Sequence, residues 1–313
     1  MKTVSFSQKH LIGIDQWADA EIQAALDRAQ FYADHIAADT GYSNDTLRGR
    51  RVLNLFFENS TRTRASFDMA ARRLGAEAIN LDIATSSVKK GETLMDTVAT
   101  MAAIVRPDAI VMRHSEYGAP GYVAPHVKCP VINAGDSWRE HPTQALLDAL
   151  TIIRRKGGIA GRTIAICGDI AHSRVANSNM ILLTRLGANV RVIAPPALVP
   201  QKFPVAGVRH FETMEDGLPG CDIVMMLRLQ KERMQAGLIE SESDYFKHYG
   251  LTPERLALAG RDADVMHPGP MNRGVEIADE VADDPQRSLI LEQVRNGVPA
   301  RMAVLELLIG ARA

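Results

Sequence analysis

Short apolar runs and amphipathic stretches alternate along the first half of the chain. Val52–Phe57 is an apolar run of strand length, and from Phe67 to Leu74 apolar side chains recur at the i, i+3, i+4, i+7 spacing of a helix. The order continues with a strand over 78–81, a helix over 94–105 and a strand over 109–112. Because helical crossovers join parallel strands, this order predicts a parallel sheet covered by helices.

A second set of strands and helices follows the glycine-rich break at Gly157–Gly158. The sequence predicts strands over 163–167, 190–193, 223–227 and 263–266, and helices over 15–38, 174–186 and from near Pro142 to the break. A helical segment over 288–310, interrupted near Pro299, closes the chain. We therefore expect an α/β protein with two doubly wound parallel-sheet domains, 1–150 and 151–287, and the 288–310 helix packed on the first domain.

Composition and charge narrow the class of protein. The 313 residues include 36 Lys and Arg against 37 Asp and Glu, for a net charge of −1, whereas nucleic-acid binders carry a basic excess. The three cysteines lack the close spacing of zinc sites and cannot all pair, which indicates a reducing compartment. No membrane-spanning stretch or signal-peptide core is found, so we predict a soluble cytoplasmic protein without a membrane or nucleic-acid partner.

Hydroxyl and guanidinium groups come directly after the first predicted strand, in Ser60-Thr61-Arg62-Thr63-Arg64. Ligands of parallel sheets bind beyond the carboxyl ends of the strands, and the N–H groups and hydroxyls at a helix N-terminus bind anions. Arginine adds a planar fork for two phosphate oxygens. The segment therefore predicts a phosphate site. Two arginines in a first helical turn favour this reading over the alternative, a Ser60 cap beside exposed arginines.

Basic side chains follow other predicted strands as well, namely Arg113, Arg174 within 168–174, Arg228, and His267 within 267–270. Each of them could be a surface residue, but their recurrence at strand ends favours one shared site. His141-Pro142-Thr143-Gln144 lies where a loop enters a helix, so His141 and Gln144 can face one side. The polar segment 85–92 fits either a solvated loop or a lid that delivers Lys90 to an anion.

Together these residues resemble the aspartate/ornithine transcarbamoylase family over nearly the whole chain. Ser60–Arg64 is similar to the family's carbamoyl-phosphate motif, and His141–Gln144 to its second shared motif. Lys89–Thr93, Arg228–Arg233 and His267–Pro270 resemble the aspartate branch, and the ornithine branch's His-Cys-Leu-Pro and Ser-Met-Gly patterns are not found. The resemblance implies an active site in the cleft between two domains, where the carbamoyl group of carbamoyl phosphate passes to the amine of L-aspartate. The products are N-carbamoyl-L-aspartate and phosphate, in an early step of de novo pyrimidine synthesis.

The resemblance also implies a role for each candidate residue. Ser60, Thr61, Arg62 and Thr63 hold the phosphate; Thr63, Arg113 and His141 face the carbonyl oxygen; Gln144 contacts the carbamoyl NH₂; Gly269 and Pro270 complete the carbamoyl phosphate site; Lys90, Arg174, Arg228 and Gln230 bind aspartate. Catalysis rests on positioning and on charge stabilisation at the carbonyl oxygen. The departing phosphate accepts the amine proton, so no metal or cofactor is implied. Ser86 and Lys90 come from the neighbouring subunit of a homotrimer.

One position departs from the aspartate enzymes of the best-known type, which have Pro-Leu-Pro where this chain has Pro268-Gly269-Pro270. The carbonyl of Gly269 could still contact the carbamoyl group, on a looser loop. A possible regulatory chain or dihydroorotase-like partner stays open.

Three other functions are less consistent with the residues. Arg228 disfavours a transcarbamoylase acting on ornithine, with its cationic side chain, and an acylated ornithine is a related alternative. The complete set of basic residues disfavours a non-catalytic phosphometabolite-binding homologue. A nicotinamide dehydrogenase would need Gly-x-Gly-x-x-Gly after a strand, and none is found.

Overall fold

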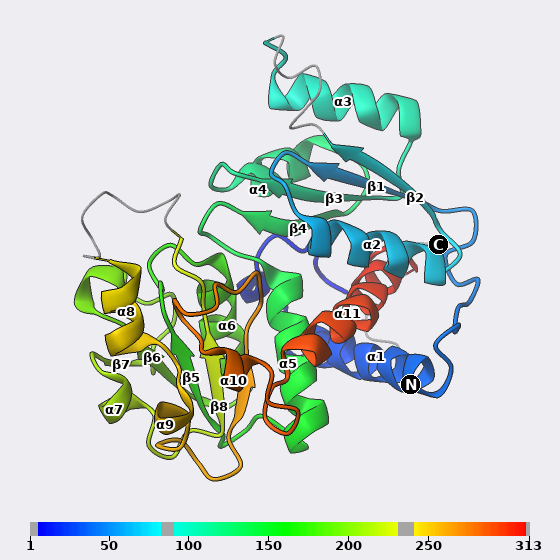
Figure 1. The fold of residues 1–313 in the computed structure, drawn as a ribbon. Coiled ribbons are helices and arrows are strands. Elements are labelled where there is room, and N and C mark those ends of the chain that lie inside the picture. The colour runs from blue at the N-terminus through cyan, green and yellow to red at the C-terminus, as the bar shows by residue number, and fades with distance from the viewer. Residues whose placement is uncertain (1–5, 83–90, 231–240, 311–313) are drawn as a thin grey trace. The chain divides into compact units, whose positions relative to one another are not determined.

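The computed structural model describes residues 6–82, 91–230 and 241–310 (Figure 1). The chain divides into two compact units. Unit 1 consists of residues 1–150 with 295–313, and unit 2 of residues 151–294. Two helices, α5 (Pro142–Lys156) and α11 (Ile290–Gly310), contain the residues at which the chain passes from one unit to the other.

Unit 1 contains a four-stranded parallel sheet in the order β2-β1-β3-β4. Its strands are β1 (Arg51–Phe56), β2 (Glu77–Asp82), β3 (Ala109–His114) and β4 (Val131–Asp136). The first three were predicted from their apolar runs, and β4 was not. In the register, Val52 of β1 lies opposite Ala78 of β2 and Ala109 of β3. The carboxyl ends of β1, β3 and β4 therefore lie at one edge of the sheet.

Helices cover both faces of this sheet (Figure 1). They are α1 (Asp19–Ala38), α2 (Thr61–Arg73), α3 (Leu94–Val105), α4 (Ala119–Val123), the first part of α5 and the later part of α11. One apolar cluster joins Leu55 and Met112 of the sheet to Val98 of α3 and Val123 of α4. The opposite face packs α2, whose Phe67 is fully buried. Short 3₁₀ turns cover Ile14–Gln16 and Ala124–His126.

Unit 2 contains a five-stranded parallel sheet in the order β7-β6-β5-β8-β9. The strands are β5 (Thr163–Cys167), β6 (Asn189–Ile193), β7 (Arg209–Phe211), β8 (Ile223–Met226) and β9 (Asp264–Met266). The helices are α6 (Arg174–Arg185), α7 (Met214–Gly217), α8 (Glu242–Tyr249), α9 (Pro253–Leu256) and α10 (Asp279–Ala282), with a 3₁₀ turn over Pro196–Leu198.

Both faces of the second sheet are also covered, because alternate strand residues are all buried. Cys167 and Met226 belong to an apolar cluster with α7, α9 and α10, while Ile166 and Met225 point to the other face and are fully buried too. The prediction of two doubly wound parallel sheets is confirmed. No helix among the described segments is long and apolar enough to cross a membrane.

The predicted interruption near Pro299 is wrong, because α11 runs without a break from Ile290 to Gly310. Proline removes one backbone hydrogen bond and crowds the preceding turn. The next turn compensates through burial: Ala300, Met302 and Ala303 are at most 1% exposed. Burial of this apolar face holds the helix together across the proline.

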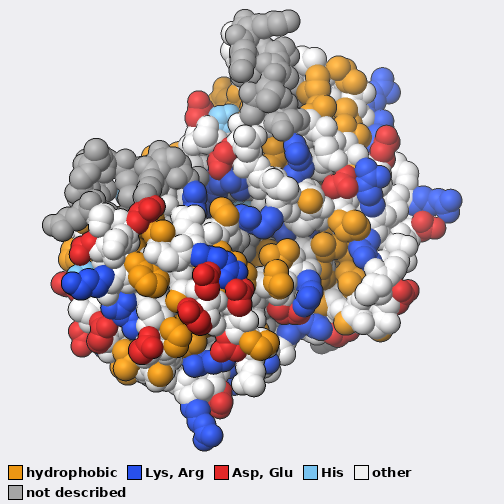
Figure 2. Space-filling model, in the orientation of Figure 1, with side chains coloured by type: hydrophobic (Ala, Val, Ile, Leu, Met, Phe, Trp, Pro, Cys, Tyr) orange, Lys and Arg blue, Asp and Glu red, His pale blue; other side chains and the backbone are white. Residues whose placement is uncertain are grey.

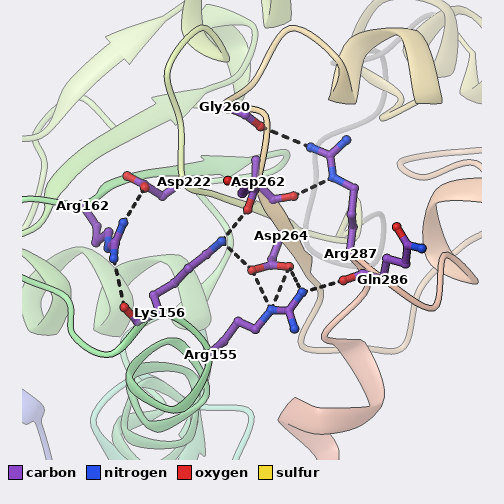
Figure 3. Close-up of polar contacts among 10 residues, drawn as sticks. Arg155, Lys156, Arg162, Asp222, Gly260, Asp262, Asp264, Gln286 and Arg287 are labelled. Carbon is purple, nitrogen blue, oxygen red and sulfur yellow. Dashed lines mark hydrogen bonds and ion pairs between the residues drawn. The ribbon is translucent and has the colours of Figure 1, made fainter.

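An ionic cluster ties the end of α5 to the start of β9 inside unit 2 (Figure 3). The carboxylate of Asp264 is 1% exposed and accepts three hydrogen bonds of 3.0 to 3.1 Å from Arg155. The Nζ atom of Lys156 lies 2.7 Å from the second carboxylate oxygen. Arg155 and Lys156 also donate to the backbone carbonyls of Gln286 and Asp262. The cluster therefore joins three segments that are far apart in the sequence.

Candidate active site

The loop after β1 enters α2 at Ser60, as the strand-end rule predicted. Ser60 takes the N-cap position in extended conformation, but its side chain makes no capping hydrogen bond. Thr63 is buried, whereas Thr61 and Arg62 are exposed. The alternative, a Ser60 cap beside exposed arginines, therefore holds in position but lacks the capping hydrogen bond of the Ser60 hydroxyl. A helix N-terminus flanked by hydroxyls and a guanidinium has the donors that an anion needs.

Arg113 lies at the end of β3, in register with Phe56 at the end of β1. Its Nη2 atom donates to Glu58 Oε1 over 2.6 Å, and the Arg113 side chain is only 12% exposed. The ion pair joins the loop after β1 to β3. Arg113 and the Ser60–Thr63 segment therefore follow adjacent strands at the same edge of the unit 1 sheet.

His141 and Gln144 open α5, which follows the neighbouring strand β4. The N–H of Gln144 donates to the His141 carbonyl over 2.9 Å, and both side chains are buried. The loop that leads there is held by Asp136, whose Oδ1 atom accepts from the Asn133 side chain and from the Glu140 N–H. The predicted residues of unit 1 thus lie at or after the ends of three neighbouring strands, β1, β3 and β4. Lys and Arg side chains are interspersed with acidic ones over the face seen in Figure 2.

Gln144 has a partner that the sequence analysis missed. Its Nε2 atom donates to Asp148 Oδ1 over 3.0 Å, and Asp148 is fully buried. Arg301 of α11 is buried too, and its guanidinium lies 5.0 Å from the ring centre of Phe67 in α2. Burial lowers the pKa of Arg301, and the charge of Asp148 opposes that shift. The signal for Asp148 was present in the sequence, because residues four apart on a helix are neighbours.

The loop after β5 carries the basic residues of unit 2. Gly168 adopts φ of +127°, and a Cβ atom there would lie 2.6 Å from the carbonyl oxygen of Leu227. Only glycine fits this close approach of two strand ends. Arg174 is the first residue of α6, whose N-terminus is capped by the Ser173 side chain. Arg174 is 6% exposed, so it is held well inside the unit.

Asp169, a second missed residue, links this loop to the segment after β8. Its carboxylate is buried, lies 2.8 Å from the His172 ring and accepts the N–H of Gln230 over 3.2 Å. Arg228 in turn donates to Gln230 Oε1 over 3.2 Å. Arg174 and Arg228 therefore follow adjacent strands, β5 and β8, in segments that share one buried carboxylate.

The 267–270 loop follows β9 and is held by a buried pair. His267 Nε2 lies 3.1 Å from Glu276 Oε1, and both side chains are fully buried. The N–H of Gly269 donates to His267 Nδ1 over 2.9 Å. Because Nδ1 accepts, Nε2 carries the proton and donates to Glu276. Gly269 has φ of +65°, which favours glycine there.

Two predicted residues, Ser86 and Lys90, lie outside the described residues. Within the described ranges, no three His, Cys, Asp or Glu side chains are grouped to hold a metal ion.

Comparison with known proteins gives two family matches that together cover most of the chain. Residues 9–154 match the carbamoyl-P binding domain of aspartate/ornithine carbamoyltransferase. Residues 160–308 match the Asp/Orn binding domain of the same family.

Curated relatives are similar over nearly their full length. The aspartate carbamoyltransferase catalytic subunit of Rhodospirillum rubrum is 57% identical, over 97% of this chain and 95% of that protein. The subunit of the same name from Granulibacter bethesdensis is 55% identical, over 99% and 98%.

Solved structures share the fold. Aspartate transcarbamoylase of Trypanosoma cruzi, in complex with N-(phosphonacetyl)-L-aspartic acid, has a TM-score of 0.84 at 32% identity, over 95% of this chain and 94% of that one. Ornithine carbamoyltransferase of Pyrococcus furiosus has a TM-score of 0.87 at 28% identity, over 98% and 99%.

Proposed function

The chain belongs to the aspartate/ornithine carbamoyltransferase family, and from this premise we propose that it carbamoylates L-aspartate. The carbamoyl group comes from carbamoyl phosphate, and the products are N-carbamoyl-L-aspartate and phosphate, as in de novo pyrimidine synthesis. Fold likeness does not separate the two branches, since an ornithine enzyme also matches with a TM-score of 0.87. The relatives at 55–57% identity do, because they are named aspartate carbamoyltransferase catalytic subunits.

The single observation that supports aspartate most directly is the pair of arginines at adjacent strand ends of unit 2. Arg174 and Arg228 follow β5 and β8, in segments joined by Asp169. Two guanidinium forks suit the two carboxylates of aspartate, whereas the ornithine side chain would bring a cation to them. Gln230, and Lys90 beyond the described residues, would complete the aspartate site. We assign 151–287 as the aspartate-binding domain.

Unit 1 offers the groups that carbamoyl phosphate requires. Ser60, Thr61, Arg62 and Thr63 would bind the phosphate at the N-terminus of α2. Arg113 and His141, with Thr63, would stabilise the negative charge that grows on the carbonyl oxygen as the amine attacks. We assign residues 1–150, with the 288–310 helix, as the carbamoyl-phosphate-binding domain. The amine proton would pass to the departing phosphate.

Other residues would contact the carbamoyl end of carbamoyl phosphate. Gln144 would contact the carbamoyl NH₂. Gly269 and Pro270 would add a backbone contact, from the loop that His267 holds in place. Reaction then depends on how well these groups orient the two substrates, which is worth about 7–11 kcal/mol in well-oriented systems.

The surface of unit 1 supports a homotrimer that shares its sites through Ser86 and Lys90. Three large apolar or aromatic side chains of unit 1 are exposed: Ile104, Tyr117 and Tyr122 are 69%, 61% and 59% exposed. A cavity of about 560 Å³ is lined by the start of α3, by Tyr117 and by α4 residues up to Tyr122. A second copy of the chain would cover this surface. The mass of the native assembly in solution would show the trimer and also any regulatory or dihydroorotase-like partner bound to it.

The experiment that tests the function is turnover of carbamoyl phosphate with L-aspartate and, separately, with L-ornithine. We expect product with aspartate only. Arg228→Leu should raise the KM for aspartate at least about a hundredfold, since a fully engaged charge pair is lost. Arg261→Leu is the matched control, because Arg261 is an exposed arginine of the same unit. Turnover with ornithine alone would overturn the proposal.

A mixing experiment tests whether each active site contains residues of two subunits. Lys90→Ala and Arg174→Ala should each be inactive. Mixing the two variants under conditions of subunit exchange should restore some activity, because a mixed trimer contains sites with neither substitution. If the mixture stays inactive although exchange is proven, each site is built from one chain.

A further inference from the structure

The amide of Gln144 is fixed by one buried neighbour. Gln144 and Asp148 are four residues apart on α5, so their side chains stack on one face of the helix. Gln144 Nε2 donates to Asp148 Oδ1 over 3.0 Å, and the two side chains are 9% and 0% exposed. The contact therefore lies out of water, where a hydrogen bond to a charged group is strong.

The chemistry of the partner decides which way the amide faces. A side-chain amide can present either its oxygen or its NH₂ in the same place, and its orientation is set by its partners. An ionised carboxylate only accepts hydrogen bonds. Asp148 therefore binds the NH₂ of Gln144 and leaves Oε1 on the other side of the amide.

Arg301 is a buried cation whose charge interacts with that of Asp148. The guanidinium is 3% exposed, packs on the Phe67 ring and donates to the Gly297 carbonyl over 3.1 Å. The charge of Asp148 raises the pKa of Arg301, against the burial that lowers it. The attraction between the two charges is mutual, so the buried guanidinium offsets part of the cost of burying the Asp148 carboxylate.

We propose that Asp148 is a positioning residue that turns the Oε1 atom of Gln144 toward the carbamoyl NH₂ of the donor substrate. The inference rests on the proposed function, because it requires Gln144 to meet that group. An acceptor at this place binds an NH₂ and gains nothing from a methyl group. Asp148 thus makes the site select carbamoyl phosphate over acetyl phosphate, which carries CH₃ where carbamoyl phosphate carries NH₂.

The test compares the two phosphates in Asp148→Asn. Asparagine keeps the shape of aspartate, but its amide can either donate or accept a hydrogen bond. The Gln144 amide can then rotate so that its Oε1 and NH₂ change places. We expect the KM for carbamoyl phosphate to rise about tenfold and the inhibition constant of acetyl phosphate to change less than about twofold. Gln144→Ala should show the same loss of selectivity between carbamoyl phosphate and acetyl phosphate. The double variant, Gln144→Ala with Asp148→Asn, should show no further loss. Asp27→Asn is the matched control: Gln23 and Asp27 form the same i, i+4 pair on the exposed face of α1.

The outcomes separate the inference from the proposed function. If the wild-type protein does not carbamoylate aspartate, the function itself fails. If Gln144→Ala loses selectivity and Asp148→Asn keeps it, only the role of Asp148 is overturned. If Asp148→Asn loses affinity for both phosphates equally, Asp148 is a purely structural residue, and its positioning role is also overturned.

A second measurement covers the case in which Asp148→Asn does not fold. The side-chain NH₂ of Gln144 should exchange slowly with water in the ligand-free wild-type protein, because Asp148 holds it. Fast exchange in the folded protein would overturn the inference.

Discussion

Replacing Asp264 by asparagine tests whether the ionic cluster at the end of α5 stabilises unit 2 (Figure 3). The substitution keeps the size of the side chain and removes its charge. In the wild-type protein, the Asp264 carboxylate is 1% exposed and binds both Arg155 and Lys156. In the variant, the amide NH₂ would face two sets of cationic donors with no acceptor between them.

The expected cost follows from the exposure of the partners. Losing one member of a fully buried ion pair costs about 3–5 kcal/mol, whereas exposed pairs are worth about 0–1 kcal/mol. The side chain of Lys156 is 12% exposed, but that of Arg155 is 47% exposed and can be rehydrated. We therefore expect Asp264→Asn to lower the free energy of unfolding by about 3 kcal/mol.

Each unit carries its own probe for the measurement. The two tryptophans, Trp17 and Trp138, belong to unit 1. Cys167 and Cys221 belong to unit 2 and are buried. Urea titration followed by pulsed thiol labelling, in a Cys129→Ser background, reports unit 2. Fluorescence in the same samples reports unit 1.

Asp283→Asn is the control, since it cuts an exposed ion pair with Arg273 in the same unit. We expect no measurable shift there. If Asp264→Asn moves the thiol transition no further than this control, the cluster does not stabilise unit 2 and the burial argument is refuted.

Three other predictions follow from local geometry. Glu21 of α1 accepts N–H groups of Ala18 and Ser7, which outweigh burial and lower its pKa. Glu21→Gln should therefore cost about 1 kcal/mol at pH 7, and the difference from wild type should shrink as the pH falls below 4.5 and vanish once the pH is below the lowered pKa of Glu21, as chemical denaturation at several pH values will show. Gly168→Ala should cost about 1–3 kcal/mol and raise the KM for aspartate, because a Cβ would meet a carbonyl oxygen at 2.6 Å; unchanged kinetics would contradict this. Burial raises the pKa of Cys129 to about 11, so iodoacetamide should label this thiol at pH 8 about a hundredfold more slowly than an ordinary cysteine, with mass spectrometry as the readout.

The positions of strands could be predicted where most of their residues are apolar. β8 is entirely apolar, and β1 is apolar from Val52 to Phe56 except for Asn54. β4 reads Val-Ile-Asn-Ala-Gly-Asp, because its Asn133 and Asp136 face inward to bind backbone and loop groups. Asn133 also donates to the carbonyl of Ile12, which is far away in the chain, so the sequence does not show that these polar residues are buried. The unbroken α11 was missed for a similar reason, since the packing that carries it past Pro299 is tertiary.

Some residues of the candidate site could likewise be predicted from the sequence, and others could not. Ser60–Thr63, Arg113 and Arg228 could be found because strand ends in parallel sheets point to ligands. Two buried carboxylates of the site were missed: Asp148, which binds Gln144, and Asp169, which binds His172 and the N–H of Gln230. Their importance comes from burial and from the partners that the fold brings, which for Asp169 include an N–H group after a different strand.

The discontinuity of unit 1 sets an order for folding during synthesis. Unit 1 needs the α11 residues from 295 onward, whose Glu306 binds Arg28 and Tyr32 of α1 over 2.7 and 2.6 Å. A ribosome that has completed residue 150 must first make the whole of unit 2, which takes roughly 7–30 seconds at 5–20 residues per second. Unit 2 can close as soon as it emerges. The surfaces of α1 and α2 that wait for α11 are therefore the part of the nascent chain most in need of a chaperone.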